Sequence, residues 1–208
     1  MKKLLIPFLA LSIASAFAQT NVVTPEFLWK LGRVSDPQLS PDGKEALYNI
    51  RSFKLELNKG NSDIWKVNLE TGKATLLAGD TSCNETSAKW SADGKKIFFL
   101  SDLGGVSHFC SMNPDGSNPT QEAKFDKDVN AYGISPDGSM IWLAMDVQVD
   151  KTVKDLNPDL PKTSGRIYDD LMYRHWDIWA DGSYSHIFIA KFTNGDRKST
   201  RLNSSHRT

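Results

Sequence analysis

A cluster of charged and aromatic side chains between residues 149 and 184 is the part of the sequence best suited to form a binding site. Its members include Asp155, Asp159, Asp169, Asp170, Arg174, His175, Trp176, Asp177 and Trp179. Because a long insertion in a compact fold is usually either functional or disordered, and aromatic residues argue against disorder, we expect an ordered, functional segment. The alternative is purely structural: Asp170 and Arg174, four residues apart, would form an ion pair on a short helix.

Patterns for catalysis, metal binding and nucleic-acid binding are absent from the sequence. It contains no Gly-x-Ser-x-Gly motif, so no serine, acid and histidine can be assigned as a catalytic triad. His108, His175 and His186 lack the spacing of metal ligands, and we expect no metal and no cofactor. With 25 basic and 25 acidic residues and no basic stripe interleaved with aromatics, the chain is not expected to bind nucleic acid.

Two cysteines, Cys83 and Cys110, are the only ones in the chain. An exported protein would reach an oxidising compartment, where the two could form a disulfide. The alternative is that they are separate thiols packed as small hydrophobic side chains. The sequence leaves both open, because it does not give the distance between them.

Three similar turns organise the middle of the chain. They are Ser40 to Lys44 (SPDGK), Ser91 to Lys95 (SADGK) and Ser135 to Ser139 (SPDGS). In such a turn proline presets φ, aspartate bonds the backbone and glycine adopts the positive φ that closes a hairpin. The turns recur at the roughly 40–50-residue spacing of propeller blades.

Apolar segments follow each turn and predict the strands of the blades. The runs from Ala46, Ile97 and Met140 are continuous rather than alternating, which indicates strands buried on both faces. A second repeat starts at Ser62, Ser107 and Ser185 and predicts a third strand in each blade, which ends in a glycine turn. The outer strands of the first two blades would be Ala74 to Leu77 and Pro119 to Ala123. The third outer strand would begin after Gly195. We therefore predict an all-β fold, a partial β-propeller of about three blades, each a four-stranded antiparallel sheet.

The opening of the mature chain predicts a short helix before the first blade. Thr24 would be its N-cap, Pro25 its first residue and Gly32 its stop. The turns resemble the propeller repeats of the prolyl oligopeptidase family of serine peptidases. The opening from Thr24 to Pro37 (TPEFLWKLGRVSDP) and the segment from Asp170 to Asp177 (DLMYRHWD) are similar to its dipeptidyl and acylaminoacyl peptidase branch.

This resemblance implies that the parent protein is a peptidase. It does not imply that this chain catalyses a reaction by itself. Family members carry a Ser-Asp-His triad on a C-terminal α/β-hydrolase domain, which this sequence lacks, so we expect the chain itself to be inactive. They use propeller insertions and carboxylates to hold the free amine of a peptide substrate. By that resemblance Asp169 and Asp170 would bind the amine, and Arg174 would lie near a substrate carbonyl. Two alternatives are a non-enzymatic periplasmic propeller acting as a protein-interaction scaffold and a different hydrolase with a similar propeller.

Both ends of the chain differ in character from its middle. Lys2 and Lys3 followed by an apolar run resemble a signal peptide, cleaved between Ala18 and Gln19, so we expect export to the periplasm or medium and no membrane attachment afterwards. An uncleaved membrane anchor is the alternative. Residues 196–206 resemble the translation of a sequencing adapter, an ordinary polar tail being the alternative. We therefore expect a signal peptide at 1–18, a partial propeller at 19–195 with an insertion at about 149–184, and a non-native tail at 196–208.

Overall fold

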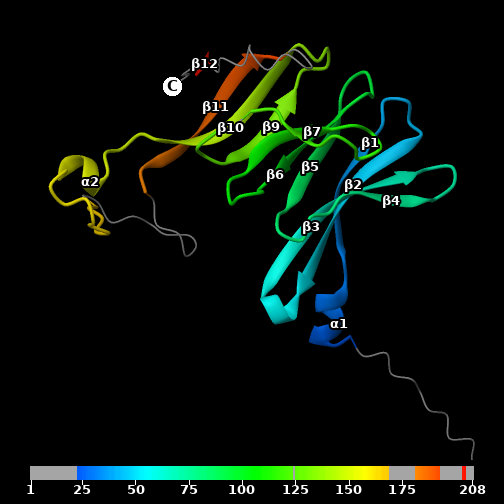
Figure 1. Ribbon diagram of the computed structural model, residues 1–208, viewed down its shortest axis with the longest axis horizontal. Helices are drawn as coiled ribbons and strands as arrows, with labels where there is room; N and C mark the ends of the chain where they lie inside the picture. The colour runs from blue at the N-terminus through cyan, green and yellow to red at the C-terminus, as the bar shows by residue number, and fades with distance from the viewer. Residues whose placement is uncertain (1–22, 124, 169–180, 193–202, 205–208) are drawn as a thin grey trace, which may run out of the picture.

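The computed structural model describes residues 23–123, 125–168, 181–192 and 203–204 (Figure 1). The first of its three sheets contains β1 (Arg33–Leu39), β2 (Glu45–Lys54), β3 (Lys59–Asn68) and β4 (Ala74–Ala78). The second contains β5 (Glu85–Trp90), β6 (Ile97–Ser101), β7 (His108–Met112) and β8 (Thr120–Gln121). The third contains β9 (Val129–Ile134), β10 (Met140–Gln148), β11 (Ser183–Lys191) and β12 (Asn203–Ser204). Three short helical segments are α1 (Pro25–Lys30), η1 (Leu55–Leu57) and α2 (Val153–Leu156).

All three sheets are antiparallel, and their strands are paired in sequence order. The second sheet packs between the first and the third, as the contacts of β5 with β3 and of β7 with β9 indicate. This arrangement confirms the predicted all-β fold of about three four-stranded blades. Among the described residues, no helix is long and apolar enough to cross a membrane. The predicted cleavage site at Ala18 and Gln19 lies outside the described residues.

The helix α1 precedes the first blade, as predicted. The Thr24 side-chain oxygen accepts a hydrogen bond from the Phe27 amide at 3.2 Å, and Pro25 occupies the start of the helix. This cap satisfies one of the amide groups that have no partner inside a helix. The last helical residue is Lys30, two residues before the predicted stop at Gly32.

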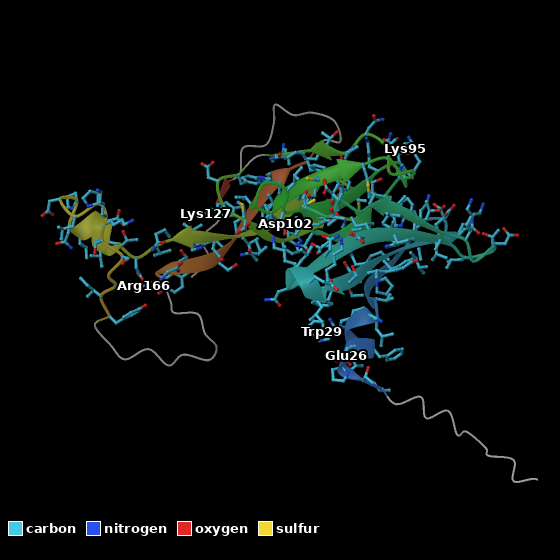
Figure 2. The ribbon with its side chains drawn as sticks, turned by 60° about the horizontal axis from the view of Figure 1, so that its bottom comes forward. Glu26, Trp29, Lys95, Asp102, Lys127 and Arg166 are labelled. Atoms are coloured by element: carbon cyan, nitrogen blue, oxygen red, sulfur yellow. The ribbon has the colours of Figure 1, made fainter. Side chains whose placement is uncertain are left out.

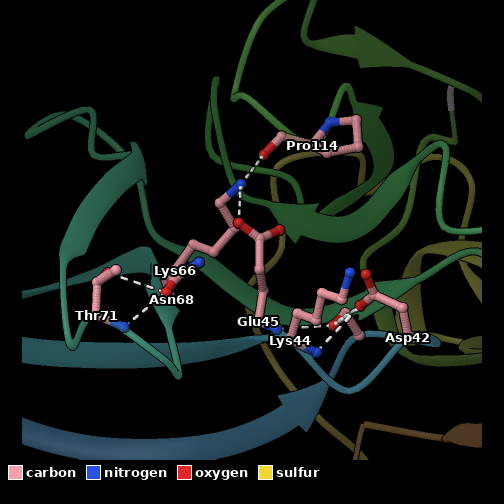
Figure 3. Close-up of polar contacts among 8 residues, drawn as sticks. Asp42, Lys44, Glu45, Lys66, Asn68, Thr71 and Pro114 are labelled. Atoms are coloured by element: carbon pink, nitrogen blue, oxygen red, sulfur yellow. Dashed lines mark hydrogen bonds and ion pairs between the residues drawn. The ribbon is translucent and has the colours of Figure 1, made fainter.

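The three repeated turns share one set of hydrogen bonds. In the first turn, Ser40 Oγ donates to Asp42 Oδ1 at 2.7 Å, and the same carboxylate oxygen accepts from the Lys44 amide at 3.1 Å (Figure 3). Gly43 has a φ of +70°, which explains why glycine is needed there. The equivalent contacts join Ser91, Asp93 and Lys95 in the second turn and Ser135, Asp137 and Ser139 in the third.

Two hydrophobic cores lie on the two sides of the second sheet. The core between the first and second sheets contains Leu47, Ile64, Ala88, Ile97, Phe99, Cys110 and Met112. The core between the second and third sheets contains Phe98, Leu100, Phe109, Val129, Tyr132, Ile141, Leu143, Met145 and Ala190. Since successive side chains of a strand point to opposite faces, β6 contributes alternate residues to both cores.

The prediction of strands buried on both faces is correct for β6 and wrong for β10. All five residues of β6 are buried. In β10 burial alternates, and Met140 and Trp142 remain 37% and 39% exposed. The physical reason is that the second sheet has a neighbour on each face, whereas among the described residues the third sheet packs against a neighbour on one face. A continuous apolar run therefore did not by itself indicate two-sided burial in this chain.

The outer strands differ in length from those predicted. The first blade ends in β4, one residue longer than expected, and the second ends in β8, which is confined to Thr120–Gln121. The fourth strand of the third blade, β12, lies within the tail that we expect to be non-native, where Asn203 and Ser204 pair with Ile189 and Phe188. Backbone pairing at a sheet edge does not require a particular sequence, so such a pairing carries no evidence on the origin of the tail.

Polar contacts also join neighbouring blades. Lys66 of β3 forms an ion pair with Glu45 at 3.0 Å and donates to the Pro114 carbonyl oxygen of the second blade at 2.8 Å (Figure 3). The hydroxyl of Tyr132 in the third blade lies 2.6 Å and 2.8 Å from the carbonyl oxygens of Ser87 and Phe98 in the second blade. Burial raises the pKa of Tyr132, so this hydroxyl keeps its proton and acts as a donor.

Candidate functional site

The two ends of the blades differ in the length of their connections. Because the strands alternate in direction, the three Ser-x-Asp-Gly turns lie at one end, which we call the turn end. The opposite end, the loop end, holds α1, the β2–β3 connection with η1, and the long segment between β10 and β11 that includes α2 (Figure 1). A binding site built on long connections would therefore lie at the loop end.

The insertion leaves the third blade through a short hydrogen-bonded neck. Gln148 is the last residue of β10 and is paired with Ser183, the first of β11. Its side-chain nitrogen donates to the carbonyl oxygens of Asp150 and Asp181 at 2.9 Å and 2.8 Å, and its side-chain oxygen accepts from Ser183 Oγ at 2.9 Å. The Val149 amide donates to the Gly182 carbonyl at 2.9 Å. The two chains of the insertion are thus held together where they leave the sheet.

Gly182 is the tightest point of this neck. It has a φ of +78°, and a Cβ atom there would lie 2.7 Å from the Cβ of Asp150. Both the backbone conformation and the close approach require glycine. A larger residue would force the two sides of the neck apart and would change the direction in which the insertion projects.

Three described carboxylates of the insertion, Asp150, Asp155 and Asp181, accept hydrogen bonds. A bond from the Tyr184 hydroxyl to Asp150 at 3.0 Å raises the pKa of the tyrosine. Hydrogen bonds from the Ser183 amide lower the pKa of Asp181, and those from Thr152 lower the pKa of Asp155 in the capping box of α2. The lowered pKa values keep Asp155 and Asp181 ionised, so these exposed carboxylates can bind a cationic group without moving a proton, which suits recognition rather than acid–base catalysis.

The three residues predicted to bind substrate, Asp169, Asp170 and Arg174, lie outside the described residues, as do His175 and Trp179. Neither the binding role nor the alternative ion pair between Asp170 and Arg174 is tested, and both remain predictions. The described part of the insertion places the root of this segment on the third blade, at the loop end. The neck residues around Gly182 were not predicted from the sequence, although a glycine directly before a strand is a recognisable signal.

A second group at the loop end involves α1. The Arg33 guanidinium carbon lies 4.2 Å from the ring centroid of Phe53, and the rings of Trp29 and Phe53 pack edge to face at 5.2 Å. These contacts fix α1 on the first blade. Figures 1 and 2 show α1 and its Trp29 well apart from α2 and Arg166, so this group and the described part of the insertion form separate clusters.

The cysteines do not form the disulfide that the sequence left open. Cys83 and Cys110 are buried free thiols. Burial raises the pKa of Cys83 to about 12 and that of Cys110 to about 11. At neutral pH both are protonated, and neither is suited to act as a nucleophile.

Comparison with known proteins places these features in a family. No family model matches the chain. Over 203 residues it is 37% identical to dipeptidyl-peptidase 5 of Porphyromonas gingivalis. This alignment covers 94% of this chain and 29% of the relative. Dipeptidyl-peptidase 5 of Porphyromonas endodontalis is 33% identical over 174 residues, 83% of this chain and 25% of the relative. These matches support the resemblance of the chain to the N-terminal region of the prolyl oligopeptidase family. It spans between a quarter and a third of the length of these curated relatives.

Solved structures support the fold assignment independently. An acylaminoacyl peptidase from Pyrococcus horikoshii superposes with a TM-score of 0.62 at 15% identity, over 85% of this chain and 26% of that one. TolB from Acinetobacter baumannii superposes with a TM-score of 0.50 at 19% identity, over 81% of this chain and 31% of that one. At these identities the likeness shows the fold alone.

Proposed function

We propose that this chain is the propeller region of an exported serine peptidase that removes dipeptides or blocked residues from the N-termini of peptides. The observation that carries the proposal is the 37% identity to a dipeptidyl-peptidase over 94% of the chain. The described blades contain strands that stack around buried cores, and the sequence has no nucleophile motif. The role left to this region is to admit and orient substrates, while catalysis requires a further domain.

The insertion of the third blade is the part that we assign to substrate selection. Its neck is held by Gln148 and Gly182, so the segment leaves the sheet in a defined direction. In this proposal Asp169 and Asp170 bind the free amine of the peptide, and Arg174 lies near a substrate carbonyl. Carboxylates are suited to this task because an N-terminal ammonium is a strong hydrogen-bond donor in an ion pair.

Export is a separate part of the proposal. The basic residues Lys2 and Lys3, the apolar run and the small residues before Gln19 would direct the chain across the inner membrane and be removed. Mass spectrometry of protein recovered from the periplasm should find Gln19 as the first residue. Recovery of uncleaved chain with the membranes would favour the anchor instead.

Activity is tested by comparing this chain with the uninterrupted reading frame of its parent gene. The parent should release chromophore from dipeptidyl substrates and be labelled by a serine-directed fluorophosphonate. The 208-residue chain should do neither. A parent frame that ends without a Gly-x-Ser-x-Gly motif, or a parent inactive on blocked and unblocked dipeptides, would favour a scaffold propeller.

Within an active parent, Asp169→Asn and Asp170→Asn should raise KM for substrates with a free amine by about tenfold. They should leave hydrolysis of N-blocked substrates unchanged, because a blocked terminus carries no ammonium. The exposed Asp146→Asn, on β10 of the same blade and outside the insertion, is the matched control. An equal effect on free and blocked substrates would show that the carboxylates stabilise the insertion instead of binding the amine.

A further inference from the structure

A cavity lies between the first and second blades, away from the insertion. Its volume is about 380 Å³, within the range of small-molecule sites, and it is partly open to solvent. Most of its wall is apolar and comes from Leu77, Ala78, Phe99, Leu103, Met112 and Pro119. The outer strands β4 and β8 both contribute to this wall, so the cavity lies toward the outside of the blades.

Three polar residues form a row across this apolar wall. Glu85 of β5 is paired with Ser101 of β6, and Ser101 is paired with His108 of β7. Directly paired residues of an antiparallel sheet point to the same face, and all three line the cavity. The sequence shows nothing of this row, because its members come from three strands and meet only through the register.

Two atoms of the row are buried and lack a hydrogen-bond partner. Glu85 is 5% exposed, and while its Oε1 lies 3.0 Å from Cys83 Sγ, its Oε2 has no partner in the described structure. The same is true of Nδ1 of His108. Unpaired buried polar atoms destabilise a fold, and those in native proteins usually have a partner such as a water or a ligand.

The chain that leads into Glu85, the first residue of β5, is fixed. The neighbouring Asn84 donates through its side-chain nitrogen to Asp102 at 2.7 Å and accepts from the Ser62 amide of the first blade at 3.1 Å. Figure 2 shows Asp102 near the centre of the described blades. At the other side of the cavity, Gly116 packs against Leu77, where a Cβ would lie 2.8 Å from the leucine carbonyl oxygen. Both walls of the cavity are therefore held in place.

The electrostatic surroundings of the cavity are negative. Asp80 lines it, and hydrogen bonds from Ser82 lower the pKa of Asp80, which keeps that carboxylate ionised. Burial first, and then the neighbouring charge of Asp63, raises the pKa of Glu85. Among the described residues that line the cavity, none is a lysine or an arginine. An ammonium group placed beside Glu85 would favour its carboxylate form against the effect of burial, and it would also provide the donor that Glu85 Oε2 lacks.

We propose that this cavity binds a small primary amine with an apolar body, whose ammonium group donates to Glu85 and whose apolar part packs against Phe99 and Met112. The proposal is independent of the peptidase function, because the cavity is formed by the first two blades alone. Both of those blades are present in full in this chain. His108 would accept or donate a further hydrogen bond at the polar end of the ligand.

The test uses 2-phenylethylamine as the probe and 2-phenylethanol as its neutral analogue, on the full 208-residue chain. Ligand-observed NMR titration should show binding of the amine, and the alcohol should bind at least about tenfold more weakly because it cannot form the ion pair. Equal binding of the two probes, or no binding of the amine, would overturn the proposal.

Variants locate the site and separate binding from folding. Glu85→Gln should weaken amine binding by about tenfold or more, whereas Glu70→Gln, on an exposed turn, should leave it unchanged. Ala78→Leu, which places a larger side chain into the cavity, should weaken both probes. If near-UV circular dichroism shows that Glu85→Gln does not fold, Ala78→Leu and the two probes decide the question. Unchanged amine binding in a folded Ala78→Leu would refute the site.

Discussion

The exposed apolar face of the third blade should make this chain associate with itself. Met140, Trp142, Ile187 and Ile189 share one face of β10 and β11 and remain 37%, 39%, 57% and 41% exposed. Complete burial of a large apolar side chain stabilises by about 1.5–3 kcal/mol. Because these four are only partly buried, covering the exposed part of each in a dimer would add about 1 kcal/mol of binding free energy. A symmetric pair would gain about 8 kcal/mol, part of which the loss of rotational and translational freedom offsets.

This magnitude predicts weak dimers, with a Kd in the range of about 10 µM to 1 mM. Sedimentation velocity between about 10 and 500 µM should show a concentration-dependent shift toward dimer. The double variant Ile187→Thr and Ile189→Thr should abolish the shift, since threonine keeps the strand preference and removes the apolar surface. Ile167→Thr, at an exposed apolar residue of the insertion, is the matched control and should behave like the unaltered chain. A chain that sediments as a monomer throughout, or a double variant that still dimerises, would refute the reasoning.

Three further predictions concern stability and protonation. Deleting residues 196–208 should leave thermal unfolding unchanged despite the pairing of β12, and a loss above about 1 kcal/mol would contradict the expectation of a non-native tail. Tyr132→Phe should lower the free energy of unfolding by about 1–3 kcal/mol in urea denaturation, because it removes a buried donor between blades, while the exposed Tyr184→Phe should change it by less than about 0.5 kcal/mol. Hydrogen bonds from Ser135 and Ser139 lower the pKa of Asp137 from 3.8 to about 2. Its stabilising contribution should therefore be complete above pH 3.8 and lost as the pH falls toward 2, and NMR titration should show Ser135→Ala raising that pKa.

The sequence predicts local structure in this chain well because the relevant signals are local. The Ser-x-Asp-Gly turns, the Thr24 cap and the strand repeats all act within a few residues, and the structure confirms each of them. Burial was harder, because the exposure of Trp142 depends on whether another sheet packs on it. The row of Glu85, Ser101 and His108 was beyond prediction, since it exists only through the register of three strands.

The difference between the turn end and the loop end has a consequence for how such repeats diversify. At the turn end, the connection between the first two strands of each blade needs a serine, an aspartate and a glycine in fixed positions, so changes of its length would break several bonds at once. At the loop end, the β2–β3, β6–β7 and β10–β11 connections occupy equivalent places yet have very different lengths. A duplicated blade would therefore contain a Ser-x-Asp-Gly turn that already folds and a loop-end connection whose length can change. New recognition surfaces can arise in such a protein without any change to the framework that carries them.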